Sequence, residues 1–399
     1  MGRNLRLFYI FGFMRELTPM LAIWVVYLTD YRDLTLTQVG VMEMLFFGVR
    51  LCVEIPSGAF ADRFGRRAAF MTGIGLEASG TLIFAVAGDF TLLTASYVMW
   101  AAGLAFRTGN DEAYLYDTLL SDDRESEYSD RIGVYTALGT TALLVGTVAG
   151  GVIADLTDLR VAILAALVPF ALAFPVMMMM GEPPRHRATH GASLMSTLRK
   201  GLGTVRRRYD LRSILLLEVA LSATFPAWAL LSQPFLDSHG VRVGLFGVIM
   251  IPTLLARIGG GLISGRVTRS IGLTATLTAS VIGASSGMFV VAAIDHVAAY
   301  AGVALAIGSV ALALPAIGAY VNERTDSDVR ATVLSVAPMG TSIVIALVSA
   351  ATGGIGEQSL RLAFAAIGAS VLVAGGINLL NWHEASKRVP VSAPELVEA

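Results

Sequence analysis

Residues 58–67 read GAFADRFGRR, and this short polar stretch decides how the rest of the chain is interpreted. It places four charged side chains and two glycines between two long apolar runs. In membrane proteins, short basic segments between apolar runs favour the cytoplasmic side of the bilayer. This stretch, the basic knot, therefore predicts a loop between two membrane-spanning helices.

The composition supports a membrane location for the whole chain. Of the 399 residues, 55% are hydrophobic and 15% are charged, and the mean hydropathy is +0.68. Soluble domains carry about 25% charged residues, so these values indicate a polytopic membrane protein with the lipid bilayer as its surroundings. The net charge of −1 gives no sign of a nucleic-acid partner, and one cysteine excludes an internal disulfide and a cysteine-based metal site.

Twelve apolar segments are long enough to cross a bilayer, which takes about 20 residues each. The sequence therefore predicts an all-α protein with twelve transmembrane helices. Their approximate extents are 5–28, 36–58, 68–88, 91–118, 130–154, 160–180, 213–236, 242–265, 272–294, 297–321, 330–353 and 360–382.

The basic residues favour one orientation of these helices. With the N-terminus inside, most of them fall in cytoplasmic loops, so both termini are expected in the cytoplasm and the chain in the cell membrane as a multi-pass protein. The first segment is expected to stay as an uncleaved helix. The cytoplasmic group comprises Arg3, Arg6, Arg63, Arg66, Arg67, Arg206 to Arg208, Arg266, Arg269, Lys387 and Arg388.

One long polar break, 181–212, divides the segments into two sets of six. We expect an N-terminal bundle at 1–180, a cytoplasmic linker at 181–212, a C-terminal bundle at 213–382 and a cytoplasmic tail at 383–399. Within the linker, apolar residues at helical spacing alternate with basic ones, which predicts an amphipathic helix on the membrane surface. These apolar residues are Leu194, Leu198, Leu202 and Val205.

The basic knot has a faint echo in the second half, GLISGRVTRS at 261–270. Each copy follows the second helix of its half, which indicates two parallel halves. In this alignment Gly58, Arg63 and Arg66 match Gly261, Arg266 and Arg269.

The basic knot resembles the loop between helices 2 and 3 of the major facilitator superfamily. That motif is a glycine, three residues, Asp-Arg, any residue, then Gly-Arg-Arg or Gly-Arg-Lys. It is matched here by Gly58, Asp62, Arg63, Gly65, Arg66 and Arg67. The resemblance implies two six-helix bundles around a central cavity, and a secondary transporter that works by alternating access.

The residue types of the knot suit a conformational latch. Gly58 permits close helix approach and Gly65 a tight turn. Asp62 is expected to cap the helix that begins near Arg330, which this motif meets in the family. Arg66 is expected to pair with Asp117, at the end of the fourth helix. The alternative is that the knot's arginines act only as topology anchors.

Two further segments resemble drug:proton antiporters of this superfamily. In the fourth helix, FRTGNDEAYLYD places Arg107 where the family has its functional arginine, although Asn110-Asp111-Glu112 stands where Gln-Gly is common. In the fifth, GTVAGG at 146–151 resembles Gly-Pro-x-x-Gly-Gly, with Thr147 in place of the proline. The upstream glycine of that pattern is Ala142 here. These likenesses imply proton-coupled export.

Ionisable residues at membrane depth are costly and are functional candidates by default. Helical spacing predicts that Arg107 pairs with Asp111, and Arg50 with Glu54, whereas other acids lack a partner on their own helix. An acid buried without a partner titrates nearer neutral pH, as proton coupling requires. The expected proton carriers are Glu112, Glu16 and Glu43, with Arg107 and Arg15 as the cations that bias them. For each acid alone, a structural ion pair remains an equal alternative.

Polar and aromatic side chains at membrane depth are candidates for lining a substrate cavity. Pro19, Pro226 and Pro315 are expected to break or bend their helices. The candidate lining residues are Trp24, Tyr27, Trp100, Tyr114, Glu218, Phe225 and Trp228, and packing inside the bundle or against lipid is the alternative for each.

Together these features predict proton-driven export of small amphipathic or cationic compounds. Proton-coupled uptake of a metabolite is the alternative, because the knot occurs in both kinds of transporter. Nothing in the sequence has the spacing of a nucleotide-binding, metal-binding or nucleophile motif, so an enzyme is not expected. A non-transporting sensor is a remote alternative. The energy source is expected to be the proton gradient, with no bound cofactor, and the working unit a monomer.

Overall fold

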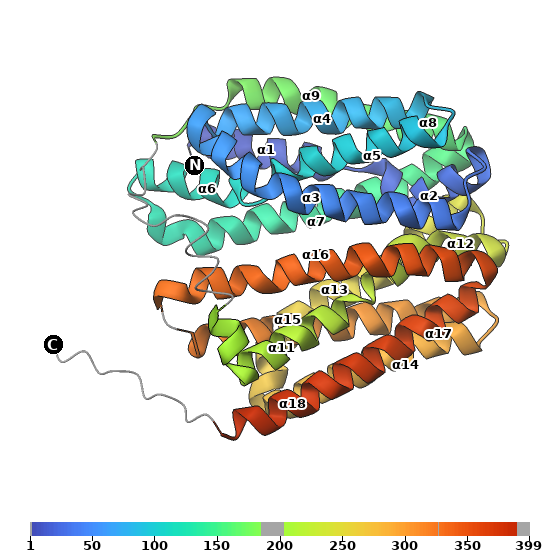
Figure 1. The fold of residues 1–399 in the computed structure, drawn as a ribbon. Helices are drawn as coiled ribbons and strands as arrows, with labels where there is room; N and C mark the ends of the chain where they lie inside the picture. The colour runs from blue at the N-terminus through green and yellow to red at the C-terminus, as the bar shows by residue number, and fades with distance from the viewer. Residues whose placement is uncertain (1, 185–202, 326, 389–399) are drawn as a thin grey trace. The chain divides into compact units, whose positions relative to one another are not determined.

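The computed structural model describes residues 2–184, 203–325 and 327–388, together with the side chains of those residues except for 327–332, 334 and 335. In these ranges the regular structure is entirely helical, and each of the twelve expected segments is helical (Figure 1). The linker residues Leu194, Leu198 and Leu202 lie outside the described ranges. Residues 203–207, in the later part of the expected linker, are helical.

The helices of the first half agree with the expected segments within a few residues, apart from internal breaks. They are α1 (Arg3–Glu16), the short turns η1 (Pro19–Ala22) and α2 (Trp24–Val26), the π-helix η2 (Tyr27–Tyr31), α3 (Leu36–Phe64), α4 (Arg66–Val86), α5 (Phe90–Ala105), α6 (Asn110–Ser121), η3 (Glu125–Glu127), α7 (Tyr128–Leu156), α8 (Leu159–Ala165) and α9 (Leu167–Met179).

The second half repeats the pattern. Its last helix continues to Ser386, into the expected tail. The helices are α11 (Tyr209–Ser222), η4 (Ala227–Leu231), α12 (Ser232–Ser238), α13 (Val243–Ile271), α14 (Leu273–Ala293), η5 (Val297–Tyr300), α15 (Ala301–Glu323), α16 (Ser327–Gln358), α17 (Leu360–Ser370), η6 (Val371–Gly375) and α18 (Gly376–Ser386).

Within the described residues, ten helices are long and apolar enough to cross a membrane, and a bent pair, Arg3–Ala22 with Trp24–Tyr31, makes eleven. The expected fourth segment, 91–118, falls short of this test because it is interrupted between α5 and α6. Gly109, in that interruption, has a φ of 73°. A left-handed backbone is readily adopted by glycine, so the chain turns there instead of continuing as a helix.

The first helix is broken where the sequence places a proline. α1 ends at Glu16, and the two parts of the span meet at an angle of 55°. Pro19 has no N–H to donate and disfavours helix in the residue before it, so an uninterrupted helix is not available. Pro226 is followed by the π-helix η4, as expected, whereas α15 runs through Pro315 without interruption.

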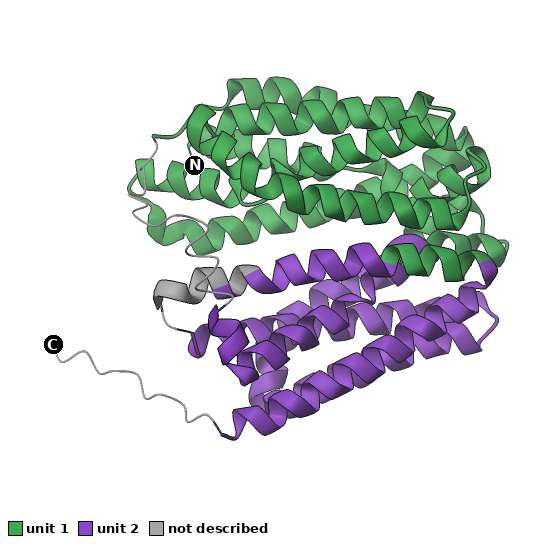
Figure 2. Cartoon of the chain, viewed as in Figure 1, with its two compact units in different colours: residues 1–188, 232–251, 349–357 green, residues 189–231, 252–348, 358–399 purple. Residues whose placement is uncertain are grey.

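The chain forms two compact units that differ from the two halves expected from the sequence (Figure 2). Unit 1 contains Met1–Ala188 together with Ser232–Ile251 and Ser349–Glu357, and unit 2 contains the remainder. Close backbone approach explains the additions to unit 1. A side chain at Gly151 would meet the carbonyl of Val243, and one at Gly40 would meet the carbonyl of Ser349.

A buried charge cluster in unit 1

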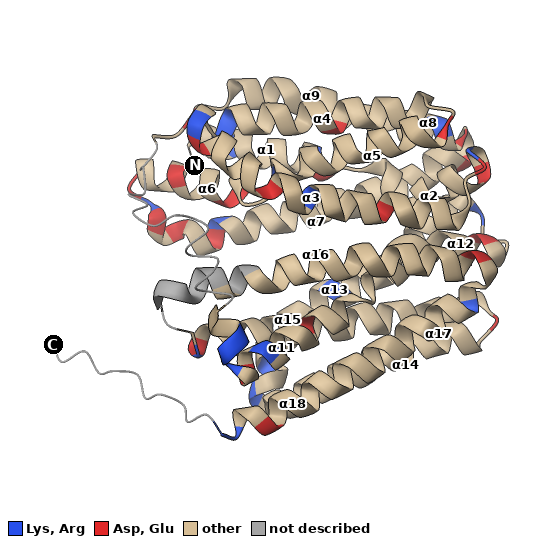
Figure 3. Cartoon of the chain, viewed as in Figure 1, with Lys and Arg blue, Asp and Glu red and all other residues tan. Residues whose placement is uncertain are grey.

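Most charged residues lie at helix ends, but a few lie along the helices of unit 1 (Figure 3). Five of them gather where α1 ends. Arg15 is 2% exposed, and its guanidinium donates two hydrogen bonds to the Asp111 carboxylate of α6, at 3.0 and 2.6 Å. It also donates to the Tyr135 hydroxyl of α7, at 2.7 Å. This two-point contact is the strong geometry for an arginine and a carboxylate.

A second ion pair lies beside the first. Glu16, next to Arg15 on α1, accepts a hydrogen bond from the Arg107 guanidinium in the break between α5 and α6. Glu77 of α4 is the third acid of the group. It is 2% exposed, and the charges of Arg107 and Arg15 act on it without a direct ion pair. One of its carboxylate oxygens is buried and has no hydrogen-bond partner in the described part of the chain.

These residues form the charge cluster: Arg15, Glu16, Glu77, Arg107 and Asp111, with Tyr135 as a neutral donor and acceptor. Three acids face two arginines, so the cluster has one acid in excess. On α3, Arg50 approaches Arg107 and interacts electrostatically with Glu54, which adds one charge of each sign and leaves the excess unchanged. A proton on one of the three acids balances the cluster.

Small residues make room for the cluster. A side chain on Gly12 would collide with the Tyr135 ring, and one on Gly103 would lie 2.7 Å from Cγ of Glu77. On α7, a side chain at Gly146 would lie 2.6 Å from the backbone nitrogen of Thr18, and one at Gly150 would overlap the Pro19 carbonyl. The glycines of GTVAGG therefore admit the broken segment of the first helix.

Two sequence predictions about this region are wrong. Arg107 and Asp111 do not pair with each other, because the turn at Gly109 separates them and each is paired with a residue of α1. Glu112, expected as a buried proton carrier, is exposed on α6.

Glu77 was missed by the sequence reasoning. The sequence signal for Glu77 is as strong as that for Glu16, Glu43 and Glu112. It is a carboxylate within the apolar run that forms α4, which is 21 residues long. The same rule for ionisable residues at membrane depth identifies it.

Glu43 lies apart from the charge cluster, in an aromatic nest. It is 8% exposed and interacts with the Tyr97 side chain. The Tyr97 ring in turn packs against Trp24, Phe46 and Trp100, with centroids 5.8, 5.8 and 6.2 Å away. Trp24 and Trp100, expected to line a substrate cavity, pack against Tyr97, the side chain that interacts with this buried acid.

Two other aromatic candidates have structural contacts instead. The Tyr27 hydroxyl donates to the Phe84 and Ala85 carbonyls and accepts from Arg32. Tyr114 is fully buried in the apolar core, where its hydroxyl donates to the Gly181 carbonyl at 2.8 Å. These contacts correspond to packing inside the bundle, the alternative given for each candidate, and a substrate contact of either side chain stays a prediction.

The basic knot is largely helical: α3 continues through Asp62 and Arg63, and the turn is confined to Gly65, with φ 109°. Arg66 lies 3.6 Å from Asp117, so the expected pair is present, and 3.5 Å from Asp62. Arg63 lies over the Phe64 ring. The helix start near Arg330, expected to meet Asp62, lies outside the described side chains.

A carboxylate from another element caps α4 at the knot. The backbone N–H groups of Arg66 and Arg67 donate to the two oxygens of Glu182, at 2.8 and 2.9 Å. The Arg67 guanidinium donates to the Met178 carbonyl at 2.5 Å. A carboxylate at a helix N-terminus meets unsatisfied N–H groups and the positive end of the dipole. The knot therefore ties α3, α4, α6 and the end of α9 together.

In unit 2, the candidate lining residues lie on α11 and in the break that follows it. Glu218 is partly buried, and no ion pair to it occurs within the described residues. Phe225 and Trp228 form an edge-to-face pair with centroids 5.5 Å apart, and the buried Trp228 indole nitrogen has no hydrogen-bond partner among the residues that the structure describes.

The fold and the knot define a secondary transporter, and comparison with known proteins gives the family. The sequence model of the Major Facilitator Superfamily matches residues 7–347, so the chain belongs to this family of membrane transporters. The all-helical structure, with ten or eleven candidate membrane spans among its described residues, agrees with this family.

A curated relative is an uncharacterized MFS-type transporter, YxaM, of Bacillus subtilis (strain 168), 24% identical over 253 residues. The match covers 61% of this chain and 61% of that relative.

Among solved structures, a point mutant of the nucleoside transporter NupG has a TM-score of 0.78 at 11% identity, covering 97% of this chain and 100% of that one. A bacterial homologue of the human lysosomal transporter Spinster, inward-facing and unoccupied, has a TM-score of 0.76 at 15% identity, covering 98% of each chain. At these identities the likeness shows the fold alone.

Proposed function

We propose that this transporter is a proton-driven exporter of small amphipathic or cationic compounds, which exchanges substrate for protons by alternating access in the cell membrane. The observation that carries the proposal is the excess acid of the charge cluster. Glu77 is buried, and among the described residues it has no ion-pair partner and one of its carboxylate oxygens accepts no hydrogen bond. A buried unpaired carboxylate favours its protonated form, so this group can exchange a proton.

In this proposal the proton is held on the Glu77 carboxylate. While Glu77 is protonated, Arg107 is paired with Glu16 and Arg15 with Asp111, and the charges balance. Loss of the proton leaves a third negative charge that competes with Glu16 for Arg107. Because Glu16 is the last residue of α1, that competition acts directly on the break in the first helix.

The aromatic nest around Glu43 supports a cationic substrate. Tyr97 interacts with Glu43 and packs against Trp24, Phe46 and Trp100, and the faces of these rings favour a lipophilic cation. We assign substrate contact to this nest and proton exchange to the charge cluster. The role proposed for Glu43 is therefore substrate binding, in place of the proton-carrier role expected from the sequence.

Proton-coupled uptake of a small metabolite is the alternative. The fold is shared with a solved nucleoside transporter, and the fold alone does not choose between uptake and export. The likenesses in the fourth and fifth helices favour export, and the aromatic nest favours a cation over a sugar or an organic acid.

The test uses purified protein in liposomes with an acidic interior. A permanently charged lipophilic cation is added outside, with protein-free liposomes as the blank. We expect gradient-driven accumulation by the wild type and by Glu112→Gln, the matched exposed control, and none by Glu77→Gln. Exchange of labelled for unlabelled cation without a gradient should persist in Glu77→Gln, because only coupling is removed.

Two results would overturn the proposal. One is gradient-driven accumulation by Glu77→Gln at the wild-type rate. The other is no response to any cation, with nucleosides, sugars or organic acids moving in the same direction as the protons. The second result selects the uptake alternative.

We further propose that Asp62 latches the transporter in one of its states. Asp62→Asn is then expected to slow transport several-fold while expression and the apparent melting temperature stay within error of the wild type. The exposed Asp123→Asn is the control for loss of one acid. Unchanged transport kinetics in Asp62→Asn would remove the latch and leave the knot's arginines as topology anchors.

A further inference from the structure

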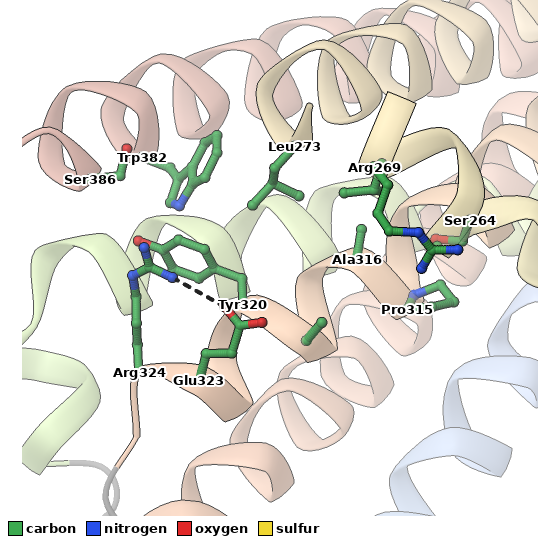
Figure 4. A pocket seen from close by; sticks show the side chains of 13 residues that line it. Ser264, Arg269, Leu273, Pro315, Ala316, Tyr320, Glu323, Arg324, Trp382 and Ser386 are labelled. Atoms are coloured by element: carbon green, nitrogen blue, oxygen red, sulfur yellow. Dashed lines mark ion pairs between the residues drawn. The ribbon is translucent and has the colours of Figure 1, made fainter. Parts of the chain in front are cut away.

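Unit 2 contains a cavity of about 640 Å³ to which neither the transport reaction nor the family match assigns an occupant. Its wall is formed by α13, α14, α15 and α18 (Figure 4). Arg269 reaches it from α13 and Arg324 from the end of α15, while Tyr320 and Trp382 lie between α15 and α18.

The cavity wall carries polar atoms that the described part of the chain leaves unpaired. Nε of Arg324 and Oγ1 of Thr268 are both buried and have no hydrogen-bond partner among the described residues. The Arg324 guanidinium stacks on the Tyr320 ring at 4.1 Å, which fixes its plane. Trp382, 3% exposed, packs edge-on against the same ring at 5.4 Å. Unpaired buried donors are costly, which indicates a site built for an acceptor.

The two units provide an internal comparison. α3 and α13 are both 29 residues long, and α4 and α14 are both 21. A glycine with positive φ joins each pair: Gly65 at 109° and Gly272 at 83°. In unit 1 the Glu182 carboxylate caps the second helix at this junction. In unit 2 no side chain among the described residues caps α14, and the cavity opens beside its first residue, Leu273.

We propose that this cavity binds an anionic amphiphile whose phosphate group meets Arg324, while Arg269, at the opposite end of the cavity, adds positive charge (Figure 4). Guanidinium groups bind phosphate through paired hydrogen bonds, and basic pockets between membrane helices suit anionic lipid headgroups. The volume exceeds what one phosphate ion needs. The wall also includes apolar residues, such as Leu273 and Pro315, and Leu262 of α13 is 80% exposed nearby in sequence.

One acid lies at the site and opposes the ligand. Glu323 lines the cavity and lies 3.7 Å from Arg324, with its side chain 73% exposed (Figure 4). The charged side chains of the wall are therefore two arginines and one glutamate. An incoming phosphate must displace this exposed carboxylate from Arg324. Removing the Glu323 charge should consequently strengthen phosphate binding at Arg324. Non-specific attraction of anions to exposed basic residues would not require this effect.

The experiment measures thermal unfolding of the purified full chain in detergent. Phosphatidylglycerol, phosphatidylcholine and inorganic phosphate are titrated separately at constant ionic strength. We expect phosphatidylglycerol to raise the apparent melting temperature with saturation. Arg269→Gln and Arg324→Gln should weaken the fitted affinity on the order of tenfold, and Glu323→Gln should strengthen it. Arg266→Gln removes one charge from α13 outside the cavity and should leave the affinity unchanged.

The outcomes separate the sources of the phosphate. A saturable rise of the melting temperature with inorganic phosphate, absent in the same arginine variants, would support the anion site. The site would then be assigned to a soluble phosphate. Equal stabilisation by phosphatidylcholine, or an equal loss of affinity in Arg266→Gln and Arg269→Gln, would overturn the proposal. Because Arg269 is exposed, its variant is expected to fold even if Arg324→Gln does not.

Discussion

Arg15 is the residue on which the organisation of unit 1 depends most. Among the described residues it is the largest fully buried side chain, and it joins three helices through Asp111 and Tyr135. Buried pairs cost desolvation energy, so the pair itself adds little net stability, but breaking it leaves one buried charge uncompensated. The cluster is thus stable only while its charges match.

Removal of one partner should destabilise the protein more than removal of both. Arg15→Gln is expected to cost about 3–5 kcal/mol, because it strands the Asp111 charge. The double variant with Asp111→Asn should recover most of that loss. Apparent melting temperatures of the two single variants and the double variant in one detergent provide the measurement. Additive losses in the double variant would show that the two residues act independently.

The residue types of the cluster were visible in the sequence, but most of their partners were not. Spacing along one helix suggested Arg107 with Asp111, whereas the actual partners come from α1, far away in the chain. The contact of Arg66 with Asp117 was predictable, because the motif fixes which helix ends meet. Pairing between helices depends on where each helix breaks, and the spacing of residues along one helix does not predict those breaks.

At the scale of elements, the break in the first helix depends on the glycine face of α7. Gly146 and Gly150 let the backbone of Thr18 and Pro19 approach α7. The sequence predicted each helical segment and the break at Pro19, since apolar length and proline are local signals. It did not predict the interruption at Gly109, because glycines also occur within continuous membrane helices.

Adding one methyl group to this face should test the contact. Gly150→Ala is expected to cost about 1–3 kcal/mol through overpacking, and to reduce transport, because the Pro19 carbonyl must move. Gly133→Ala on the same helix meets nothing within 4 Å and is the control, with stability equal to or above the wild type. Equal effects of the two substitutions on melting temperature and transport would contradict the contact.

The cap on α4 permits a second test at this scale. Glu182→Ala removes both acceptors for the Arg66 and Arg67 N–H groups and is expected to cost about 0.5–2 kcal/mol. Glu125→Ala, an exposed acid outside the knot, should change the melting temperature by less. If Glu182→Ala has the same melting temperature as the wild type, water replaces the carboxylate as acceptor and the cap does not stabilise the knot.

At the scale of the whole molecule, the chain repeats one architecture twice and uses the copies differently. The equal lengths of α3 and α13, and of α4 and α14, place the internal repeat in a register that pairs Gly65 with Gly272. The sequence echo suggested a register one helical turn away, because it aligned arginines rather than the glycine turns. The first copy holds the charge cluster and a capped junction, and the second holds an open basic cavity.

The central claim is that substrate and proton compete through the charge cluster, with the proton on Glu77. The most direct measurement adds a lipophilic cation to the purified protein in weakly buffered detergent solution and follows the pH. Wild type and Glu112→Gln should release about one proton per bound cation, as one exchangeable carboxylate requires. Glu77→Gln should bind the cation and release none. Equal proton release by Glu77→Gln and wild type would contradict the account.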